Sequence, residues 1–189
     1  MSFEADISRA LEVLKSGGII LYPTDTIWGL GCDAANEDAV KRLFSLKRRA
    51  DSKAMISLVD SLDTLCEWVE TVPETALEEI NKSGNRALTI IYDTPKGISN
   101  SLRAEDGSAA FRITSHKFSN TLCKLLGSPL VSTSANISGN PSPHSFMEIE
   151  EEIKAKADYI CHEERNNINE RASRILKIGN DGSISVIRE

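Results

Sequence analysis

The sequence lacks the residue spacings that mark common metal sites. Its four cysteines stand far apart without a CxxC pair, and its three histidines, His116, His144 and His162, show no ligand spacing. His162 beside Cys161 comes nearest to a metal site, but zinc needs three or four ligands. We therefore expect no metal site, and reduced thiols that are mostly packed in the interior.

Several familiar functional motifs are missing as well. The chain has neither GxxxxGK[ST] nor GxGxxG, so any nucleotide site must be of another design. A serine hydrolase is disfavoured, because there is no GxSxG element and His144 has no evident acid partner. Residues 1–18 carry acids and no long apolar run, which argues against a signal peptide or a membrane span there. We expect a cytoplasmic protein that does not bind membranes.

Length and composition are those of an ordinary folded protein. The 189 residues are 40% hydrophobic and 26% charged, and no linker, repeat or low-complexity segment interrupts them. One domain over residues 1–189 is the simplest interpretation. A net charge of −6 argues against a protein that binds nucleic acid by overall charge.

One segment is basic in spite of the acidic total. Residues 41–53 contain six cations and one acid, Asp51. Such a run is either a site for a polyanion or the solvated face of a helix. If a helix ends near Arg48, then Lys47, Arg49 and Lys53 lie where two or three cations would bracket a triphosphate.

The hydrophobic pattern alternates between helical and strand periods. Predicted helices are EADISRALEVLK, ended by Gly17 and Gly18, then NEDAVKRLFSLKRR capped by Asn36, SLDTLCEWV, PETALEEINKS, HKFSNTLCKLL and SFMEIEEEIKAKA. Predicted strands are IILY, AMISLV, ALTIIY, AAFRI, SPLVST, DYICH, RILKI and ISVIR, the last two joined as a hairpin by GNDGS. The order predicts an α/β fold, with a twisted mixed parallel and antiparallel sheet flanked by helices and an antiparallel part at the hairpin.

Polar loops follow several of these strands. Residues 130–143 read LVSTSANISGNPSP, and residues 22–31 read YPTDTIWGLG; a less clear case precedes GSAAFRIT. Loops beyond the carboxyl ends of strands are where α/β sheets bind ligands, so residues 130–143 are a possible pocket wall. Their hydroxyls, amides and backbone N–H groups suit phosphate or carboxylate oxygens. An elaborate turn is the alternative, because Ser, Asn, Gly and Pro form turns in any context.

Together, YPTDTIWGLGCDA, LKRRADSK and STSANISGNPSP resemble the YrdC-like family of threonylcarbamoyl-AMP synthases in order and spacing. The resemblance covers nearly the whole chain and implies the catalytic domain alone. It implies synthesis of L-threonylcarbamoyladenylate from L-threonine, bicarbonate and ATP, with release of pyrophosphate and with Mg2+ carried by ATP. The product would serve tRNA threonylcarbamoyltransferase proteins that modify the adenosine next to the anticodon.

The resemblance also assigns roles to individual residues. It places a catalytic quartet at Lys47, Arg49, Ser134 and Asn136. It assigns ATP binding to Arg49, Lys53, Ser108, Ser134, Ser142 and Arg188, and threonine binding to Thr26, Arg112, Ser132 and Ser173. Arg112 is the natural partner of the amino-acid carboxylate, because a guanidinium matches a carboxylate in shape and charge.

The chain departs from the family pattern at several places. KRRADSKA replaces KxRP with its following KP, and SGNRALT keeps only Thr89 of WPGPxT. Leu58 stands where many members have a histidine, FRIT replaces VRxP, and ASRIL replaces STI. Loss of prolines loosens loops without removing charge, so the departures bear on catalytic efficiency more than on the fold.

Two other functions therefore stay open. One is a non-catalytic paralogue that binds nucleotide, tRNA or other double-stranded RNA through its cationic concavity. The other is a different ATP-dependent carbamoyl or acyl adenylation.

Overall fold

The protein is built on a single nine-stranded sheet. A computed structural model describes residues 1–48, 55–167 and 172–189, and the strand order within these ranges is β7-β1-β2-β6-β3-β5-β4-β8-β9. The strands are β1 Ile20–Tyr22, β2 Gly29–Gly31, β3 Ile56–Val59, β4 Leu88–Tyr92, β5 Ala109–Ile113, β6 Leu130–Ser134, β7 Tyr159–Ile160, β8 Arg174–Ile178 and β9 Ile184–Arg188. The helices are α1 Phe3–Lys15, α2 Glu37–Leu46, α3 Leu62–Trp68, α4 Glu74–Ser83, α5 Lys117–Leu126 and α6 Glu151–Lys156, with short 3-10 turns η1 Asn100–Leu102 and η2 Phe146–Glu148.

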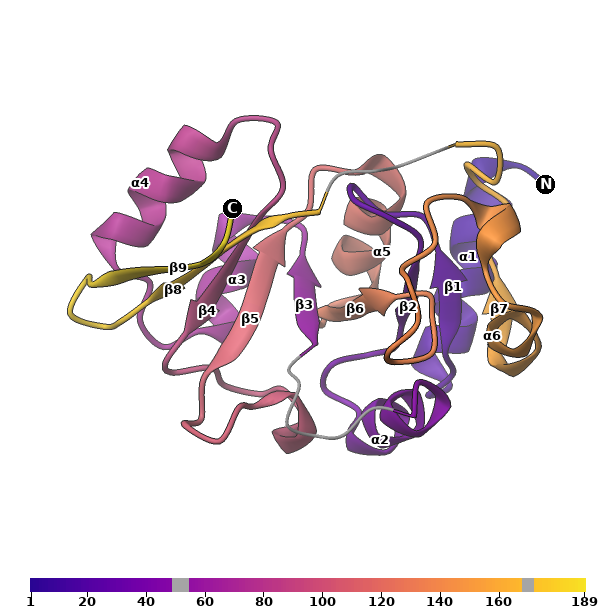
Figure 1. Cartoon of the computed structure of the whole chain (residues 1–189), viewed down its shortest axis with the longest axis horizontal. Coiled ribbons are helices and arrows are strands. Elements are labelled where there is room, and N and C mark those ends of the chain that lie inside the picture. Colours follow the sequence, from indigo (N-terminus) through magenta and orange to yellow (C-terminus); the bar gives the residue numbers. More distant parts are fainter. Residues whose placement is uncertain (49–54, 168–171) are drawn as a thin grey trace.

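The predicted mixed sheet is confirmed, and its antiparallel part is larger than expected. Parallel pairs join β1 to β7, β3 to β5 and β4 to β8. Antiparallel pairs join β1 to β2, β2 to β6, β3 to β6, β4 to β5 and β8 to β9. The hairpin across GNDGS is one of five antiparallel pairings. Figure 1 shows it beside α4 at one end of the molecule, with α1, β7 and α6 at the other end.

Strand alternation builds a separate apolar layer on each side of the sheet. Leu21, Val59, Phe111 and Val131 point to one side, into a core that also holds buried residues of α2, α3, α4 and α6. Ile20, Tyr22, Leu58 and Leu130 point to the other side, against Phe118, Leu122 and Cys123 of α5 and the buried face of α1. On that second side, α1 and α5 pack over β1, β7, β3 and β6. The sheet beyond them, over β5, β4 and β8, is left to form the floor of a cavity.

Local sequence signals account for most helix ends. The side chain of Asn36 accepts a hydrogen bond from the Ala39 N–H at 3.0 Å, which confirms the predicted cap of α2. Pro73 immediately precedes α4, as expected. Gly17, which follows α1, has φ +78°, a left-handed conformation that favours glycine. These caps fix where the loops of the sheet begin.

The segment YPTDTIWGLG contains a strand that its sequence did not predict. β2 pairs antiparallel with β1, with Tyr22 opposite Gly29 and Ile20 opposite Gly31. A Gly-Leu-Gly strand carries little of the usual β signal. Gly31 is needed for close packing instead, because a Cβ there would collide with the Val131 carbonyl oxygen and lie 2.7 Å from Cε1 of Tyr22.

The prediction of one helix over SFMEIEEEIKAKA was wrong. The segment forms η2, then turns extended at Ile149 and Glu150, and only then enters α6. Ile149 is 2% exposed, and the Glu150 carboxylate accepts a hydrogen bond from Asn140 Nδ2 at 3.0 Å. Burial of Ile149 and the contact of Glu150 with the loop after β6 therefore outweigh local helix propensity.

The cysteines are free, and most are interior. Cys32, Cys123 and Cys161 are buried, whereas Cys66 is exposed. Burial raises the pKa of the Cys123 thiol to about 12 and raises the pKa values of Cys32 and Cys161 as well. The buried thiols are therefore protonated and unreactive at neutral pH.

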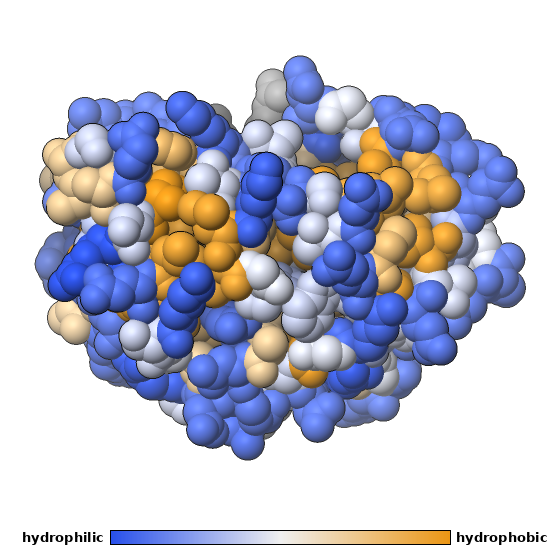
Figure 2. Space-filling view, turned by 180° about the vertical axis from the view of Figure 1, so that it is seen from behind, coloured by the Kyte–Doolittle hydropathy of each residue, from blue (hydrophilic) through white to orange (hydrophobic). Residues whose placement is uncertain are grey.

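The back of the molecule is hydrophilic apart from two patches of apolar residues, one on each side of its middle (Figure 2). No helix in the described ranges is long and apolar enough to cross a membrane.

Replacement of Gly31 by alanine should destabilise the fold. We expect the overpacked Cβ to lower the free energy of unfolding by about 1–3 kcal/mol, measured by urea denaturation. Gly29→Ala is the matched control, since its Cβ would approach side-chain atoms of Ser132 and Thr24 no closer than 3.2 Å and should cost less. An equal or smaller loss for Gly31→Ala would contradict this account of β2.

Candidate functional site

A cavity of about 410 Å³, which we call the sheet cavity, opens over the uncovered part of the sheet. Ile56, Ile91, Ala110 and Ile175 form its apolar floor. Its walls come from the PTDT turn (residues 23–28), the SAN loop (residues 134–143), Ala172 and Ser173, and β9. We expected ligands beyond the carboxyl ends of the strands. The polar loops do supply walls, but the cavity lies over the side of the sheet, because α1 and α5 leave that side open.

The structure brings together seven of the twelve residues that the resemblance assigned to the site. The seven that line the sheet cavity are Thr26, Arg112, Ser132, Ser134, Ser142, Ser173 and Arg188. They come from β5, β6, β9 and three loops. The sequence left two interpretations of residues 130–143, a pocket wall or an elaborate turn. The segment contributes to the cavity wall. Lys47, Asn136 and Ser108 lie outside the lining, and Arg49 and Lys53 lie outside the described residues.

Lys47 holds the SAN loop from behind. Its side chain is 1% exposed, and its ammonium donates to the carbonyl oxygens of Ser134 and Asn136, the latter at 2.8 Å. Ser134 Oγ donates to Asn136 Oδ1 at 2.5 Å, and Asn136 Nδ2 donates to the Asn140 carbonyl at 2.7 Å. Three members of the predicted quartet are therefore joined in one hydrogen-bond network, in which Ser134 alone reaches the sheet cavity.

The PTDT turn fixes the polarity of the Thr26 hydroxyl. Thr24 Oγ1 donates its single proton to the Ile27 carbonyl at 2.7 Å and accepts from the Thr26 N–H at 3.1 Å. It lies 3.1 Å from Thr26 Oγ1 as well, so in that pair the Thr26 hydroxyl must be the donor. The lone pairs of Thr26 Oγ1 are then left to accept from a ligand in the sheet cavity.

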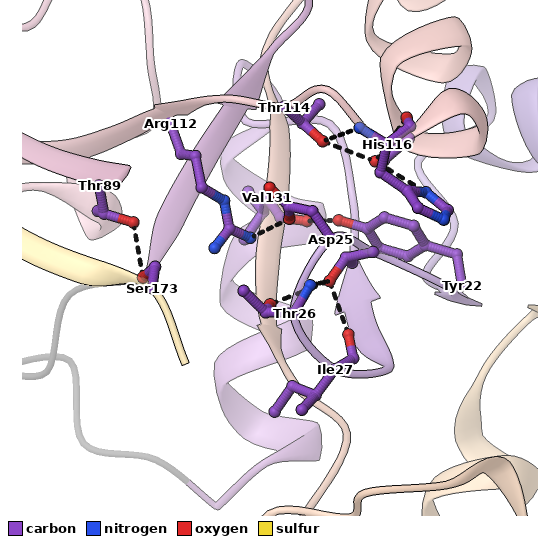
Figure 3. Close-up of polar contacts among 12 residues, drawn as sticks. Tyr22, Asp25, Thr26, Ile27, Thr89, Arg112, Thr114, His116, Val131 and Ser173 are labelled. Atoms are coloured by element: carbon purple, nitrogen blue, oxygen red, sulfur yellow. Dashed lines mark hydrogen bonds and ion pairs between the residues drawn. The ribbon is translucent and has the colours of Figure 1, made fainter. Parts of the chain in front are cut away.

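Two guanidinium groups make the sheet cavity cationic. Arg112 is 3% exposed, and its Nη2 lies 3.1 Å from Oδ1 of Asp25 (Figure 3). Arg188 donates from Nε to the Ser173 carbonyl at 2.9 Å and from Nη2 to Ser173 Oγ at 3.1 Å. Burial, and then repulsion from Arg112, lower the pKa of Arg188. The described residues that line the cavity include no carboxylate, so the two guanidinium groups favour an anionic ligand.

The hydroxyls of Thr89 and Ser173 form a second pair, which supports the position of Arg188. Thr89 Oγ1 lies 3.0 Å from Ser173 Oγ, which in turn contacts Arg188 (Figure 3 shows the first contact). Thr89, the residue kept from the WPGPxT pattern, is fully buried in β4 and lines the sheet cavity. The threonine thus has a place in the site although the rest of its motif is gone.

Ser108 and Leu58 have other surroundings. Ser108 Oγ donates to Oδ1 of Asp106 at 2.6 Å, and Asp106 also pairs with Lys177, which holds its pKa below the usual range. Leu58 is fully buried in the core beneath α5 and does not line the sheet cavity. In this chain, the position at which many family members have a histidine therefore lies outside the lining of the sheet cavity.

Sequence reasoning missed Asp25, Trp28 and His144 as site residues. Trp28 and His144 line the sheet cavity, and Asp25 contacts Arg112. The sequence did contain a signal for Asp25. It is the single acid in the PTDT turn, and an acid in such a turn commonly pairs with a nearby cation. Trp28 is 2% exposed and packs on Phe146 at 5.0 Å between ring centroids, which is how a core residue behaves.

The Sua5/YciO/YrdC family model, described as telomere recombination, matches residues 12–189. The chain belongs to this family. It is 34% identical to the threonylcarbamoyl-AMP synthase of Pseudoalteromonas translucida (strain TAC 125) over 86% of this chain and 88% of that protein. The synthase of Stutzerimonas stutzeri (strain A1501) is 32% identical over 82% of this chain and 83% of that protein.

Solved structures of this family have the same fold as the chain. P. abyssi Sua5 complexed with L-threonine matches with a TM-score of 0.82 and 25% identity over 96% of this chain. The chain spans about half of Sua5, 53% of its length. E. coli YciO matches with a TM-score of 0.85 over 100% of this chain and 90% of that one, and at 23% identity this likeness supports the fold alone.

Loss of the Lys47 ammonium should destabilise the SAN loop. In Lys47→Met, each buried carbonyl left without its donor should cost about 1–3 kcal/mol of unfolding free energy. The control Lys41→Met removes an exposed i,i+4 pair with Glu37, worth about 0.3–0.5 kcal/mol. Equal midpoints for the two variants in urea denaturation would show that Lys47 does not hold the loop.

Proposed function

We propose that this protein is a threonylcarbamoyl-AMP synthase. It joins L-threonine, bicarbonate and ATP into L-threonylcarbamoyladenylate and releases pyrophosphate. The observation that carries the proposal is the convergence of seven family-matched residues on one cationic cavity. A volume of about 410 Å³ also falls within the usual range for small-ligand sites, about 300–1,000 Å³.

The amino-acid substrate has a donor and an acceptor that match its two charged groups. Arg112 presents a buried guanidinium for the carboxylate, and Thr26 Oγ1 presents lone pairs for the N–H donors of the amine. Ser132 and Ser173 supply further hydroxyls in the same cavity. The choice of L-threonine as the amino acid is supported by P. abyssi Sua5, whose structure is complexed with L-threonine.

ATP would occupy the part of the sheet cavity formed by the SAN loop and β9. Ser134 and Ser142 offer hydroxyls, and Arg188 offers a cation for phosphate oxygens. Arg49, Lys53 and Ser108 remain predicted ATP ligands. No group of three His, Cys, Asp or Glu in the described ranges would hold a metal. Mg2+ would be carried by the triphosphate, with water as further ligands, as it commonly is.

The reaction requires positioning and charge neutralisation. The threonine amine attacks bicarbonate with loss of water to give a carbamate. A carbamate oxygen then attacks the α-phosphorus of ATP and the bond to the β-phosphate oxygen breaks, so pyrophosphate leaves. Arg188 and the hydroxyls of the SAN loop would stabilise charge that develops on the phosphates, with the predicted cations Arg49 and Lys53. The structural role of Lys47 supports this, because it keeps the backbone of the wall in place.

The product would be used in tRNA modification in the cytoplasm, by the threonylcarbamoyltransferase proteins that place the group on tRNA. Direct binding of RNA by this chain has no specific support in the basic segment. Lys41 pairs with Glu37, Arg42 with Asp158 and Arg48 with Glu152, so three of the four described cations of that segment are paired with acids. The fourth, Lys47, is buried and donates to carbonyl oxygens of the SAN loop.

Pyrophosphate release tests the proposed function. The pure protein with ATP, Mg2+ and bicarbonate should release pyrophosphate only when L-threonine is added, and mass spectrometry should find the threonylcarbamoyl adenylate. Ser134→Ala removes a hydroxyl of the cavity wall and should lower kcat/KM by about tenfold or more, or about 1.4 kcal/mol of transition-state stabilisation.

Ser138→Ala is the matched control. Ser138 lies in the SAN loop, outside the lining of the sheet cavity, and should keep nearly wild-type activity. The absence of threonine-dependent release by the wild-type protein would reject the function.

A further inference from the structure

Asp25 is not among the residues proposed to contact threonine or ATP. It lies in the PTDT turn between β1 and β2, beside Thr26, and its side chain is 13% exposed. It lines a second cavity, of about 280 Å³, whose other walls include Phe111 and Asp60. Its carboxylate nevertheless reaches Arg112, which belongs to the sheet cavity. Figure 3 shows the two side chains pointing toward one another.

The ion pair is incomplete as a stabilising contact. Oδ1 of Asp25 lies within ion-pair distance of Arg112 Nη2 but makes no hydrogen bond with it. This Oδ1 and Nε of Arg112 are both buried, and neither has a hydrogen-bond partner in the described ranges. A pair built for stability is commonly bidentate, with both guanidinium N–H groups engaged. Burial of two charges with unsatisfied hydrogen bonds costs free energy, so stability alone is a poor reason for this pair.

The charges around the sheet cavity indicate a role in binding for the pair of Asp25 and Arg112. Arg112 and Arg188 are close enough for Arg112 to depress the pKa of Arg188. Asp25 is the acid that pairs with Arg112, and Arg188 has no carboxylate partner within 4.0 Å in the described part of the chain. Asp25 therefore limits the repulsion between the two cations and contacts Arg112 from the PTDT turn.

We propose that Asp25 is a positioning residue that fixes the Arg112 guanidinium for the carboxylate of the amino-acid substrate. One end of the guanidinium faces the PTDT turn through Nη2, and the ligand carboxylate binds its remaining N–H donors. The next residue, Thr26, carries the acceptor for the substrate amine. A single turn thus sets the distance between the two groups that recognise an α-amino acid. This inference rests on the proposed function, because it concerns the same substrate.

Asp25→Asn tests this role with little change in shape. It keeps the side-chain volume and removes the charge, so Arg112 should lose its fixed orientation. We expect the KM for L-threonine to rise tenfold or more and the KM for ATP to change less than twofold. Isothermal titration should show the same weakening for L-threonine binding alone.

Asp60→Asn is the matched control. Asp60 lines the second cavity as Asp25 does, but it has no ion pair with Arg112 in the described structure. It should leave both KM values within twofold of the wild type. Asp25→Glu keeps the charge at a longer reach and should raise the KM for L-threonine less than Asp25→Asn does.

A double-mutant cycle identifies the residue through which Asp25 acts. Arg112→Lys should itself weaken threonine binding, and Asp25→Asn on that background should add less than twofold. Discrimination between L-threonine and L-threonine amide, which lacks the carboxylate charge, should also fall in Asp25→Asn.

Each outcome separates this inference from the proposed function. A wild-type protein without threonine-dependent synthesis rejects the function itself. An active wild-type protein with an unchanged threonine KM in Asp25→Asn rejects the inference alone. Equal rises in both KM values, or full additivity with Arg112→Lys, would indicate a general structural role and would also overturn it.

Discussion

The buried ammonium of Lys47 is the contact on which the site depends. A loop rich in small polar residues exposes many backbone groups, and a buried carbonyl without a donor is costly. Lys47 reaches from the end of α2 to the carbonyls of Ser134 and Asn136 and so supplies those donors. The wall of the sheet cavity is then held by a helix rather than by the loop itself. Ser134 can present its side chain to a ligand because its backbone is fixed.

The partial covering of one side of the sheet explains where the ligands meet. α1 and α5 pack over one half, and strand alternation puts Ile56, Ala110 and Arg112 on the same side over the other half. The floor of the cavity is apolar, while the strands and loops around it supply hydroxyls and cations. In such a site, each charge-assisted contact to a substrate is stronger than it would be in open water. Catalysis by positioning needs this combination.

The sequence predicts local structure well and long-range contacts poorly. The Asn36 cap, the glycines after α1 and the C-terminal hairpin follow from local patterns and were found. β2 was missed because Gly-Leu-Gly has no strand signal. Gly31 is required because Tyr22 and Val131 approach it closely, and no local sequence pattern shows this approach. Ser132 and Arg112 line the same cavity because β6 and β5 flank β3, and strand order cannot be read from alternation. The resemblance supplied the site residues, but the direction of the Lys47 side chain and the pairing of Asp25 with Arg112 needed the fold.

A crystal structure of the protein with L-threonine and a non-hydrolysable ATP analogue tests the central claim most directly. The account predicts both ligands in the sheet cavity, with the threonine carboxylate on Arg112 and phosphate oxygens near Ser134, Ser142 and Arg188. Threonine bound elsewhere, such as in the second cavity beside Asp60, or its carboxylate turned away from Arg112, would contradict it.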